Sequence, residues 1–208
     1  MWVVKLGGSL CNAAHLRNWL ALLADAGSLV IVPGGGPFAD QVRQAQRRWG
    51  FDDSCAHIMA LLAMEQFGRM LCGLQPGLVA AASVRQVEEA LERGETPVWM
   101  PAVMVLSDPG IEHSWEVTSD SLAAWLGGRL GADRLLLVKS VSLEGGGLPA
   151  ETLAERGVVD ARFGAYLQRS GIRAWVMTGD EHARFGEVLQ GSPGATTAIL
   201  AHGRPTAT

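Results

Sequence analysis

Two glycine clusters near the start of the chain could bind a phosphate group. Each cluster follows an apolar segment, residues 2–6 in the first case and 29–32 in the second, and the first segment contains Lys5. The clusters consist of Gly7, Gly8 and Ser9, and of Gly34, Gly35 and Gly36. Glycine has no Cβ, so its backbone N–H groups can approach a bulky anion closely. If the apolar segments are neighbouring parallel strands, both clusters lie where open α/β sheets bind ligands. The pattern predicts a site for a polyphosphate.

Two further groups of polar residues fall where elements are expected to begin or end. Thr118, Ser119 and Asp120 stand at the start of a predicted helix, and Lys139 ends another apolar segment. A lysine can neutralise a phosphate, backbone N–H groups can hold its oxygens, and an acidic residue can fix a lysine or reach a metal. The set is chemically sufficient for phosphoryl transfer, although the sequence contains no GxxxxGKS or GxxxxGKT motif.

Apolar segments and helical patterns alternate along the whole chain. Besides the first two strands, we expect strands at 78–82, 135–139, 174–178 and 197–201, an extended segment at 98–106 interrupted by Pro101, and a loop at 145–147. We expect helices at 13–26, 38–49, 53–72, 84–93, 118–130, 160–169 and 182–189. Asp52 or Asp53 should cap the third helix, Thr118 or Ser119 the fifth, and Arg43 should lie on the exposed side of the second. This alternation predicts an α/β domain with a mostly parallel sheet between helical layers.

Composition narrows the classes of protein. The chain has 208 residues, 48% of them apolar, and a formal net charge of −4 without a block of like charges. A nucleic-acid surface normally shows a basic stripe, and a membrane span needs about 18 apolar residues in a row, so we expect neither partner. The three cysteines form no CxxC pair, and the five histidines form no HxH or HExxH pattern. We therefore expect a cytoplasmic protein without a structural metal.

The predicted helix at 53–72 is apolar on almost every side around residues 58–64. A surface of this kind is seldom left to water, so we expect a homo-oligomer. His57 lies on this helix and is more consistent with a packed core or interface residue than with a catalyst. His113 and Trp115 lie in a predicted loop just before Asp120, where contact with a substrate is plausible.

Four stretches together resemble the amino acid kinase family, which includes acetylglutamate, aspartate, uridylate and isopentenyl phosphate kinases. The stretches are VVKLGGSL, IVPGGGPFADQVR, VTSDSLAAWLGGRLGADRLLLVKSV and GATTAIL, and they follow the family's order over nearly the whole chain. The resemblance implies a three-layer αβα sandwich forming one kinase-like domain over residues 1–208. It also implies that the first half, about 1–115, binds the phosphoryl acceptor and the second half, about 116–208, binds ATP.

The resemblance also implies roles for the polar residues. Lys5 would neutralise the transferring phosphoryl group, and Gly7, Gly8 and Ser9 would donate hydrogen bonds to its oxygens. Gly34, Gly35 and Gly36 would surround the acceptor side, and Thr118 and Ser119 would contact substrate. Asp120 would orient the lysines, Lys139 would lie at the nucleotide phosphates or base, and Mg²⁺ would arrive with ATP.

The chain is short for this family and is most similar to a compact branch that includes aminomethylfuran-methyl phosphate kinases, whose acceptor is itself a phosphate monoester. The residues leave both a phosphate monoester and a carboxylate open as the acceptor. It departs from many members because residues 160–185 contain no lysine, where they carry a second catalytic one. Lys139, Arg162 or Arg184 would have to replace it. A nucleotide-binding protein on the same fold that has lost catalysis is therefore the alternative. A dinucleotide-binding oxidoreductase is disfavoured because neither glycine cluster reads GxGxxG.

The lysines, the glycine clusters and Asp120 also have purely structural interpretations. Lys5 could simply extend to solvent and the glycines could form tight turns without a ligand. Asp120 could act only as a helix-capping residue, and Lys139 could be an ordinary lysine at the rim of the sheet.

Overall fold

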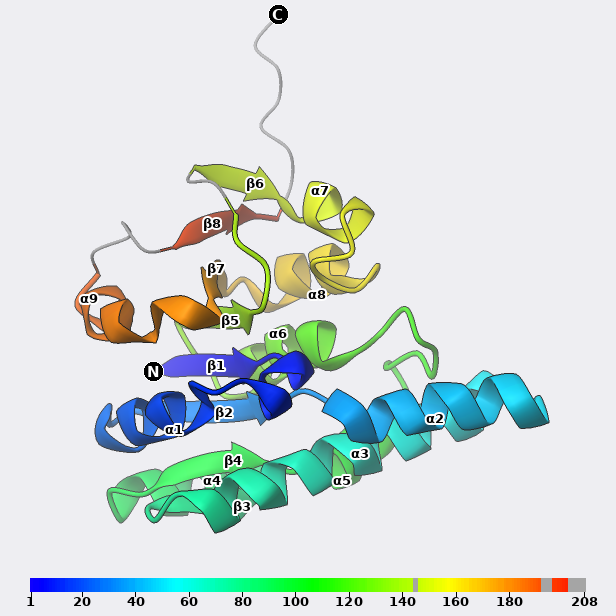
Figure 1. The fold of residues 1–208 in the computed structure, drawn as a ribbon, viewed down its shortest axis with the longest axis horizontal. Helices are drawn as coiled ribbons and strands as arrows, with labels where there is room; N and C mark the ends of the chain where they lie inside the picture. Colours follow the sequence, from blue (N-terminus) through cyan, green and yellow to red (C-terminus); the bar gives the residue numbers. More distant parts are fainter. Residues whose placement is uncertain (144–145, 192–195, 202–208) are drawn as a thin grey trace, which may run out of the picture.

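A computed structural model describes residues 1–143, 146–191 and 196–201 of the chain. In the described residues, eight strands form a single sheet in the order β3-β4-β2-β1-β5-β7-β8-β6, which can be followed from bottom to top in Figure 1. The strands are β1 (Trp2–Leu6), β2 (Leu29–Pro33), β3 (Leu78–Ala81), β4 (Thr96–Trp99), β5 (Arg134–Lys139), β6 (Gly147–Pro149), β7 (Arg173–Thr178) and β8 (Thr197–Leu200). Only the pairing of β7 with β8 is antiparallel among the described strands.

Helices pack on both faces of this sheet, so the predicted α/β sandwich is confirmed (Figure 1). The helices are α1 (Leu16–Asp25), α2 (Gly36–Trp49), α3 (Asp53–Leu74), α4 (Val84–Glu92), α5 (Ala102–Leu106), α6 (Ser119–Arg129), α7 (Ala150–Glu155), α8 (Phe163–Ser170) and α9 (Phe185–Leu189). Two 3₁₀ helices, η1 (Gly8–Asn12) and η2 (Gly179–Arg184), follow β1 and β7. In the described part of the chain, no helix is long and apolar enough to cross a membrane.

The alternation of side chains along the central strands decides which residues face α6. Val3 packs into the core on the α6 side of the sheet, whereas Val4 and Leu6 pack into the core formed with α1 and α9. Successive side chains of a strand point to opposite faces, so Lys5 lies on the same face as Val3. The same rule applies to β5, where Leu135 and Leu137 belong to the α6 core and Lys139 continues that row. Both lysines are therefore directed to one side of the sheet.

The segment 98–106 was expected to be extended, and that expectation is wrong for its second half. β4 ends at Trp99, and α5 begins at Ala102 directly after Pro101. Pro101 has φ −76°, which suits the start of a helix. Ala102 and Val105 are buried while Val103 and Leu106 are exposed, so the apolar residues follow helical spacing.

The short pair β6 and α7 was not anticipated. Gly147, expected to lie in a loop, is the first residue of β6, while residues 144–145 lie outside the described residues. Other boundaries shift by a few residues: the predicted helix 182–189 is divided into η2 and α9. Asp52 does cap α3, because its carboxylate accepts a hydrogen bond from the Cys55 N–H at 2.7 Å.

Candidate active site

The two glycine clusters are in direct backbone contact at the carboxyl ends of β1 and β2. The register pairs Leu6 with Pro33, so each cluster begins at the same level of the sheet. A Cβ placed on Gly8 would lie 2.2 Å from the amide nitrogen of Gly36, and one on Gly34 would lie 2.4 Å from that of Gly8. Any side chain at these positions would push the loops apart. The predicted convergence of the two clusters is therefore confirmed.

The N–H groups of the clusters have different uses. The Gly7 N–H donates to the Val138 carbonyl at 2.9 Å, and the Gly34 N–H donates to the Leu6 carbonyl at 2.8 Å. These bonds extend the sheet, which corrects the expectation that the Gly7 amide donates to a phosphate oxygen. Gly36 is the first residue of α2 and has φ +53°, a left-handed conformation that favours glycine. The first N–H groups of a helix have no partner within it, so this helix start suits an anion.

Lys5, Asp120 and Lys139 form a buried charged cluster on the α6 side of the sheet. The Nζ of Lys5 lies 2.8 Å from Oδ1 of Asp120, and the Nζ of Lys139 donates to Oδ2 of Asp120 at 2.7 Å. Lys5 and Asp120 are each only 4% exposed. Asp120 lies in the first turn of α6, where the helix dipole also favours a negative charge. One carboxylate thus orients two ammonium groups.

The pKa values of this cluster follow from burial and mutual attraction. Burial by itself raises the pKa of Asp120, but the charges of Lys139 and Lys5 outweigh burial and hold that pKa at about 2. Burial lowers the pKa of Lys139 to about 8, although Asp120 opposes this decrease. At neutral pH the cluster carries two positive charges and one negative charge. Its net charge is therefore suited to an anion, and Asp120 is too acidic to accept a proton as a base.

These two lysines are the only lysines in the 208-residue sequence, in which every other basic side chain apart from histidine is an arginine. Arginine carries a broad, flat fork of donors, whereas lysine is a compact point charge whose pKa responds to burial. The site of Lys5 has little space for the larger guanidinium group, because the side chain is only 5% exposed and lies beside Asp120. The distribution of lysine in this chain therefore coincides with one site.

Asp160 holds the first turn of α6 in place, a role that the sequence did not reveal. Its Oδ2 accepts hydrogen bonds from the Thr118 N–H at 2.9 Å, the Thr118 hydroxyl at 2.9 Å and the Ser121 N–H at 3.0 Å. Its Oδ1 accepts a short hydrogen bond from the Ser121 hydroxyl. Burial and the nearby charge of Asp120 raise the pKa of Asp160. Thr118 thus occupies the N-cap position, as predicted, but its side chain makes no capping hydrogen bond, and the carboxylate of Asp160 accepts from the helix start instead.

Replacing Asp160 by asparagine should lower the free energy of unfolding by about 1–2 kcal/mol, because capping and charge-assisted hydrogen bonds are lost. The same change should lower kcat, since the turn that carries Asp120 is no longer fixed. Urea unfolding and steady-state kinetics would measure both effects. Asp25→Asn, at the exposed end of α1, is the matched control. Unchanged stability and unchanged kcat in the Asp160 variant would contradict this role.

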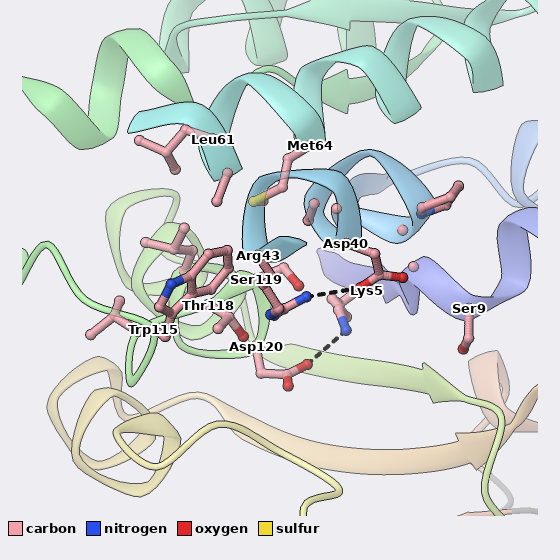
Figure 2. A pocket seen from close by; sticks show the side chains of 18 of the residues that line it. Lys5, Ser9, Asp40, Arg43, Leu61, Met64, Trp115, Thr118, Ser119 and Asp120 are labelled. Carbon is pink, nitrogen blue, oxygen red and sulfur yellow. Dashed lines mark hydrogen bonds and ion pairs between the residues drawn. The ribbon is translucent and has the colours of Figure 1, made fainter. Parts of the chain in front are cut away.

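Two adjoining cavities meet at the charged cluster. The larger, of about 350 Å³, lies between the glycine clusters, α2, α3 and the start of α6 (Figure 2). The smaller, of about 200 Å³, lies between the loops that follow β1 and β5 and is also lined by Gly157 and Val158. Both cavities are lined by Lys5, Gly8, Ser9 and Lys139. A group held at these four residues can be reached from either side.

Most of the predicted site residues line the larger cavity. They are Lys5, Gly8, Ser9, Gly35, Gly36, Thr118, Ser119, Asp120 and Lys139. Gly7 lines only the smaller of the two cavities, and Gly34 lines neither. Arg162 pairs with Glu112 and Glu116, and Arg184 pairs with Glu181 and Glu187, so both arginines point to surface carboxylates. Lys139 alone among the three suggested replacements for the late lysine lies at Asp120.

The loop before α6 also contributes to the larger cavity. Trp115 lines it, and His57 does so from α3, where the His57 ring stacks on that of His113 at 4.9 Å. His57 is 4% exposed, as expected for a packed histidine, and burial lowers its pKa. Arg43 lies on the polar side of α2 with its side chain 42% exposed, as expected, and it also lines the cavity. No local signal in α2 indicates this position in the cavity wall, which becomes apparent only from the contact of Arg43 with the distant Trp115.

Comparison with known proteins agrees with this architecture. The model of the amino acid kinase family matches residues 1–142 of the chain. The chain is 28% identical, over 96% of its length and 98% of the relative's, to [5-(aminomethyl)furan-3-yl]methyl phosphate kinase of Methanocaldococcus jannaschii.

Solved structures with the same fold include uridylate kinases and an isopentenyl phosphate kinase. The enzyme of Archaeoglobus fulgidus superposes with a TM-score of 0.72 and 20% identity, covering 96% of this chain and 100% of that one. The UMP kinase of Bacillus anthracis superposes with a TM-score of 0.73 and 16% identity, covering 97% of this chain and 96% of that one. At these levels of sequence identity, the superpositions establish a shared fold and nothing about activity.

Proposed function

The chain belongs to the amino acid kinase family, and from this premise we propose that it is an ATP-dependent kinase whose phosphoryl acceptor is a phosphate monoester. The observation that carries the proposal is the buried Lys5–Asp120–Lys139 cluster at the junction of two cavities. Phosphoryl transfer depends mainly on positioning and on neutralising charge, and two oriented ammonium groups supply both. The relative from Methanocaldococcus jannaschii supports an acceptor of this class.

The properties of Asp120 restrict the acceptor. A hydroxyl group must lose a proton as it attacks, but Asp120 has a pKa of about 2 and both of its oxygens face lysines. A phosphate monoester is largely dianionic at neutral pH, since its second pKa is about 6, so its oxygen attacks without a general base. Burial and pairing of Asp120 therefore favour an acceptor that is already ionised.

The reaction then proceeds as an in-line transfer. An oxygen of the acceptor phosphate forms a bond to the γ-phosphorus of ATP, while the bond from that phosphorus to the β,γ-bridging oxygen breaks. ADP leaves with the bonding electron pair, and the acceptor becomes a diphosphate. Lys5, within both cavities, stabilises the charge on the transferring group, and Lys139 does so from the side of β5. Asp120 keeps the two ammonium groups in position.

The two cavities correspond to the two substrates. The larger cavity is lined by residues of α2 and α3, which belong to the first half of the chain, and it is the proposed acceptor site. The smaller cavity, lined by Lys139, Ser140 and Val141 after β5, is the proposed site for the nucleotide phosphates. In the described residues, no group of three histidine, cysteine or acidic side chains could hold a metal ion. Mg²⁺ would thus be bound mainly by the ATP phosphates and water, where it neutralises phosphate charge.

The test is an ADP-release assay with Mg²⁺ and ATP over several acceptors. The panel contains [5-(aminomethyl)furan-3-yl]methyl phosphate, UMP, isopentenyl phosphate and, as a carboxylate, N-acetylglutamate. We expect turnover with a phosphate monoester and its diphosphate as the product. If ATP raises the melting temperature but no acceptor is phosphorylated, the chain is instead a nucleotide-binding protein on a kinase fold.

The exposed side of α3 supports self-association. Ile58 and Leu62, one turn apart, are 37% and 47% exposed, and α5 adds the exposed Val103 and Leu106. We expect a dimer in sedimentation velocity, and Leu62→Glu should shift it toward the monomer because a charge would be buried at the contact. Glu92→Lys on α4 is the control. A monomeric wild type would contradict this expectation.

A further inference from the structure

Arg43 is held in the wall of the larger cavity by an aromatic side chain. The guanidinium carbon of Arg43 lies 4.3 Å from the centroid of the Trp115 ring, a distance typical of a cation–π contact. Nη1 of Arg43 also donates to Oδ1 of Asp40 at 3.1 Å, which Figure 2 shows as a dashed line. The side chain of Arg43 is 42% exposed, so the guanidinium is fixed but accessible.

The tryptophan that supports Arg43 is itself fixed. Trp115 Nε1 donates to Oε1 of Gln46 at 2.7 Å, and Gln46 Nε2 donates to Oδ1 of Asp53 at 2.8 Å and to the Phe51 carbonyl at 3.2 Å. This chain of bonds ties the loop before α6 to the end of α2 and the start of α3. The orientation of Arg43 is therefore set before any ligand binds, which reduces the entropy lost on binding.

Arg43 lies where it can contact the anionic head group of an acceptor in the larger cavity. Arg43 lies on α2, the helix that begins at Gly36, and lines the same cavity as Lys5 and Gly36. Leu61 and Met64 of α3 line the cavity as well and provide an apolar surface for the remainder of a small molecule. A ligand with its anionic end at Lys5 and Gly36 would thus have Arg43 within the same enclosure.

The fork of Arg43 fits a phosphate better than a carboxylate in this reaction. Asp40 contacts Nη1 only, which leaves the Nε and Nη2 donors for a ligand. A guanidinium binds two oxygens of one anion in parallel. A phosphate monoester has three terminal oxygens, so one can attack the γ-phosphorus while two remain for Arg43. A carboxylate has two oxygens, and its attack leaves only one.

We propose that Arg43, supported by Trp115, binds the acceptor phosphate and selects phosphate monoesters over carboxylates and uncharged analogues. This assignment rests on the proposed function and makes Arg43 a specificity-determining residue. Lys5 and Lys139 act on the transferring group, whereas Arg43 acts on the group that receives it.

The test compares a phosphate ester with its alcohol. Calorimetry measures the dissociation constants of [5-(aminomethyl)furan-3-yl]methyl phosphate and of the corresponding alcohol for wild type, Arg43→Met and Arg43→Lys. Arg43→Met should weaken binding of the ester about 10- to 100-fold, the effect of losing a paired charge-assisted contact, and binding of the alcohol less than about 2-fold. The affinity of Arg43→Lys for the ester should lie between those of wild type and Arg43→Met, because lysine keeps the charge and loses the fork. KM for ATP should remain unchanged.

Arg47→Met is the matched control, since Arg47 lies one turn further along α2 and is exposed. Equal weakening of ester and alcohol in Arg43→Met would show a packing role and overturn the proposal, as would a wild type that binds the ester no better than the alcohol. If the wild type phosphorylates only N-acetylglutamate, the proposed kinase activity stands and the proposed role of Arg43 is overturned. If ester binding depends on Arg43 but no acceptor is phosphorylated, the role of Arg43 stands and the proposed kinase activity is overturned.

Discussion

Replacing Lys5 by methionine is expected to lower kcat by about 10²- to 10³-fold, the usual effect of removing one oriented group that stabilises transition-state charge. Lys5 lines both cavities and lies 2.8 Å from Asp120, so its loss removes a charge from the point where the two proposed substrate sites meet. Methionine approximates the length and volume of the lysine stem, and the strand should retain its packing. KM for ATP and for the acceptor should change less than kcat, because the stabilisation is greatest in the transition state.

Circular dichroism and thermal melting of the Lys5→Met variant would show whether the fold is intact. Lys5→Arg serves as the second variant, because it keeps the charge with a different geometry. Arg85→Met, which removes an exposed cation on α4, is the control. A Lys5→Met enzyme with normal turnover and a normal melting curve would refute the role of Lys5.

Replacing Asp120 by asparagine is expected to have the second large effect. The two lysines would lose the carboxylate that orients them, and kcat should fall by about 10²-fold. Breaking a buried charged cluster at one member costs roughly 3 kcal/mol of stability, because the remaining charges are left without compensation. Kinetics must therefore be measured at a temperature at which the variant is folded. Retention of wild-type kcat would contradict the proposed role of Asp120.

The pH dependence of wild type and Asp120→Asn separates orientation from simple loss of folding. The pKa of Lys139 is about 8, so kcat/KM for ATP, which reports on the free enzyme, should decline above about pH 8 as this ammonium deprotonates. The negative charge of Asp120 raises the pKa of Lys139. In the variant the decline should therefore begin at lower pH. A profile that does not move would mean that Lys139 is not the group responsible.

The acid limb of stability gives an independent check on the same cluster. The pKa of Asp120 falls from its ordinary value of 3.8 to about 2 on folding, so its contribution to stability is fully present above about pH 4. This contribution disappears as the pH falls through about 2, because the carboxyl group is then protonated in both states. The free energy of unfolding of the wild type, measured with urea, should decrease over this interval. This decrease should be absent from Asp120→Asn, which has no carboxyl group to protonate at this position.

The sequence predicts those parts of the candidate site that depend on local rules. Apolar segments followed by glycine predicted β1 and β2, and parallel strands place their carboxyl ends at one rim. The alternation of side chains then directs Lys5 and Lys139 to the face covered by α6, where Asp120 lies. These relations depend on periods of two and of 3.6 residues, which can be read from one sequence.

The residues that were missed act across long separations. Asp160 caps a helix that begins at Ser119, and nothing in the neighbourhood of either residue indicates the pairing. Arg43 follows the polar side of an amphipathic helix, and only the contact with Trp115, far along the chain, shows that this side faces a cavity. The break at Pro101 was predicted, but the helical segment after it was expected to be extended, because a short apolar segment fits a strand or a helix equally well.

The scarcity of lysine has a practical consequence for spectroscopy. Biosynthetic incorporation of lysine labelled with carbon-13 at Cε would label only Lys5 and Lys139 and would leave the contacts of their ammonium groups unchanged. An NMR spectrum of the intact enzyme would then contain two side-chain signals, both from the charged cluster. Titrating them would follow each ammonium group separately, and adding ATP or an acceptor would reveal which ligand each one senses.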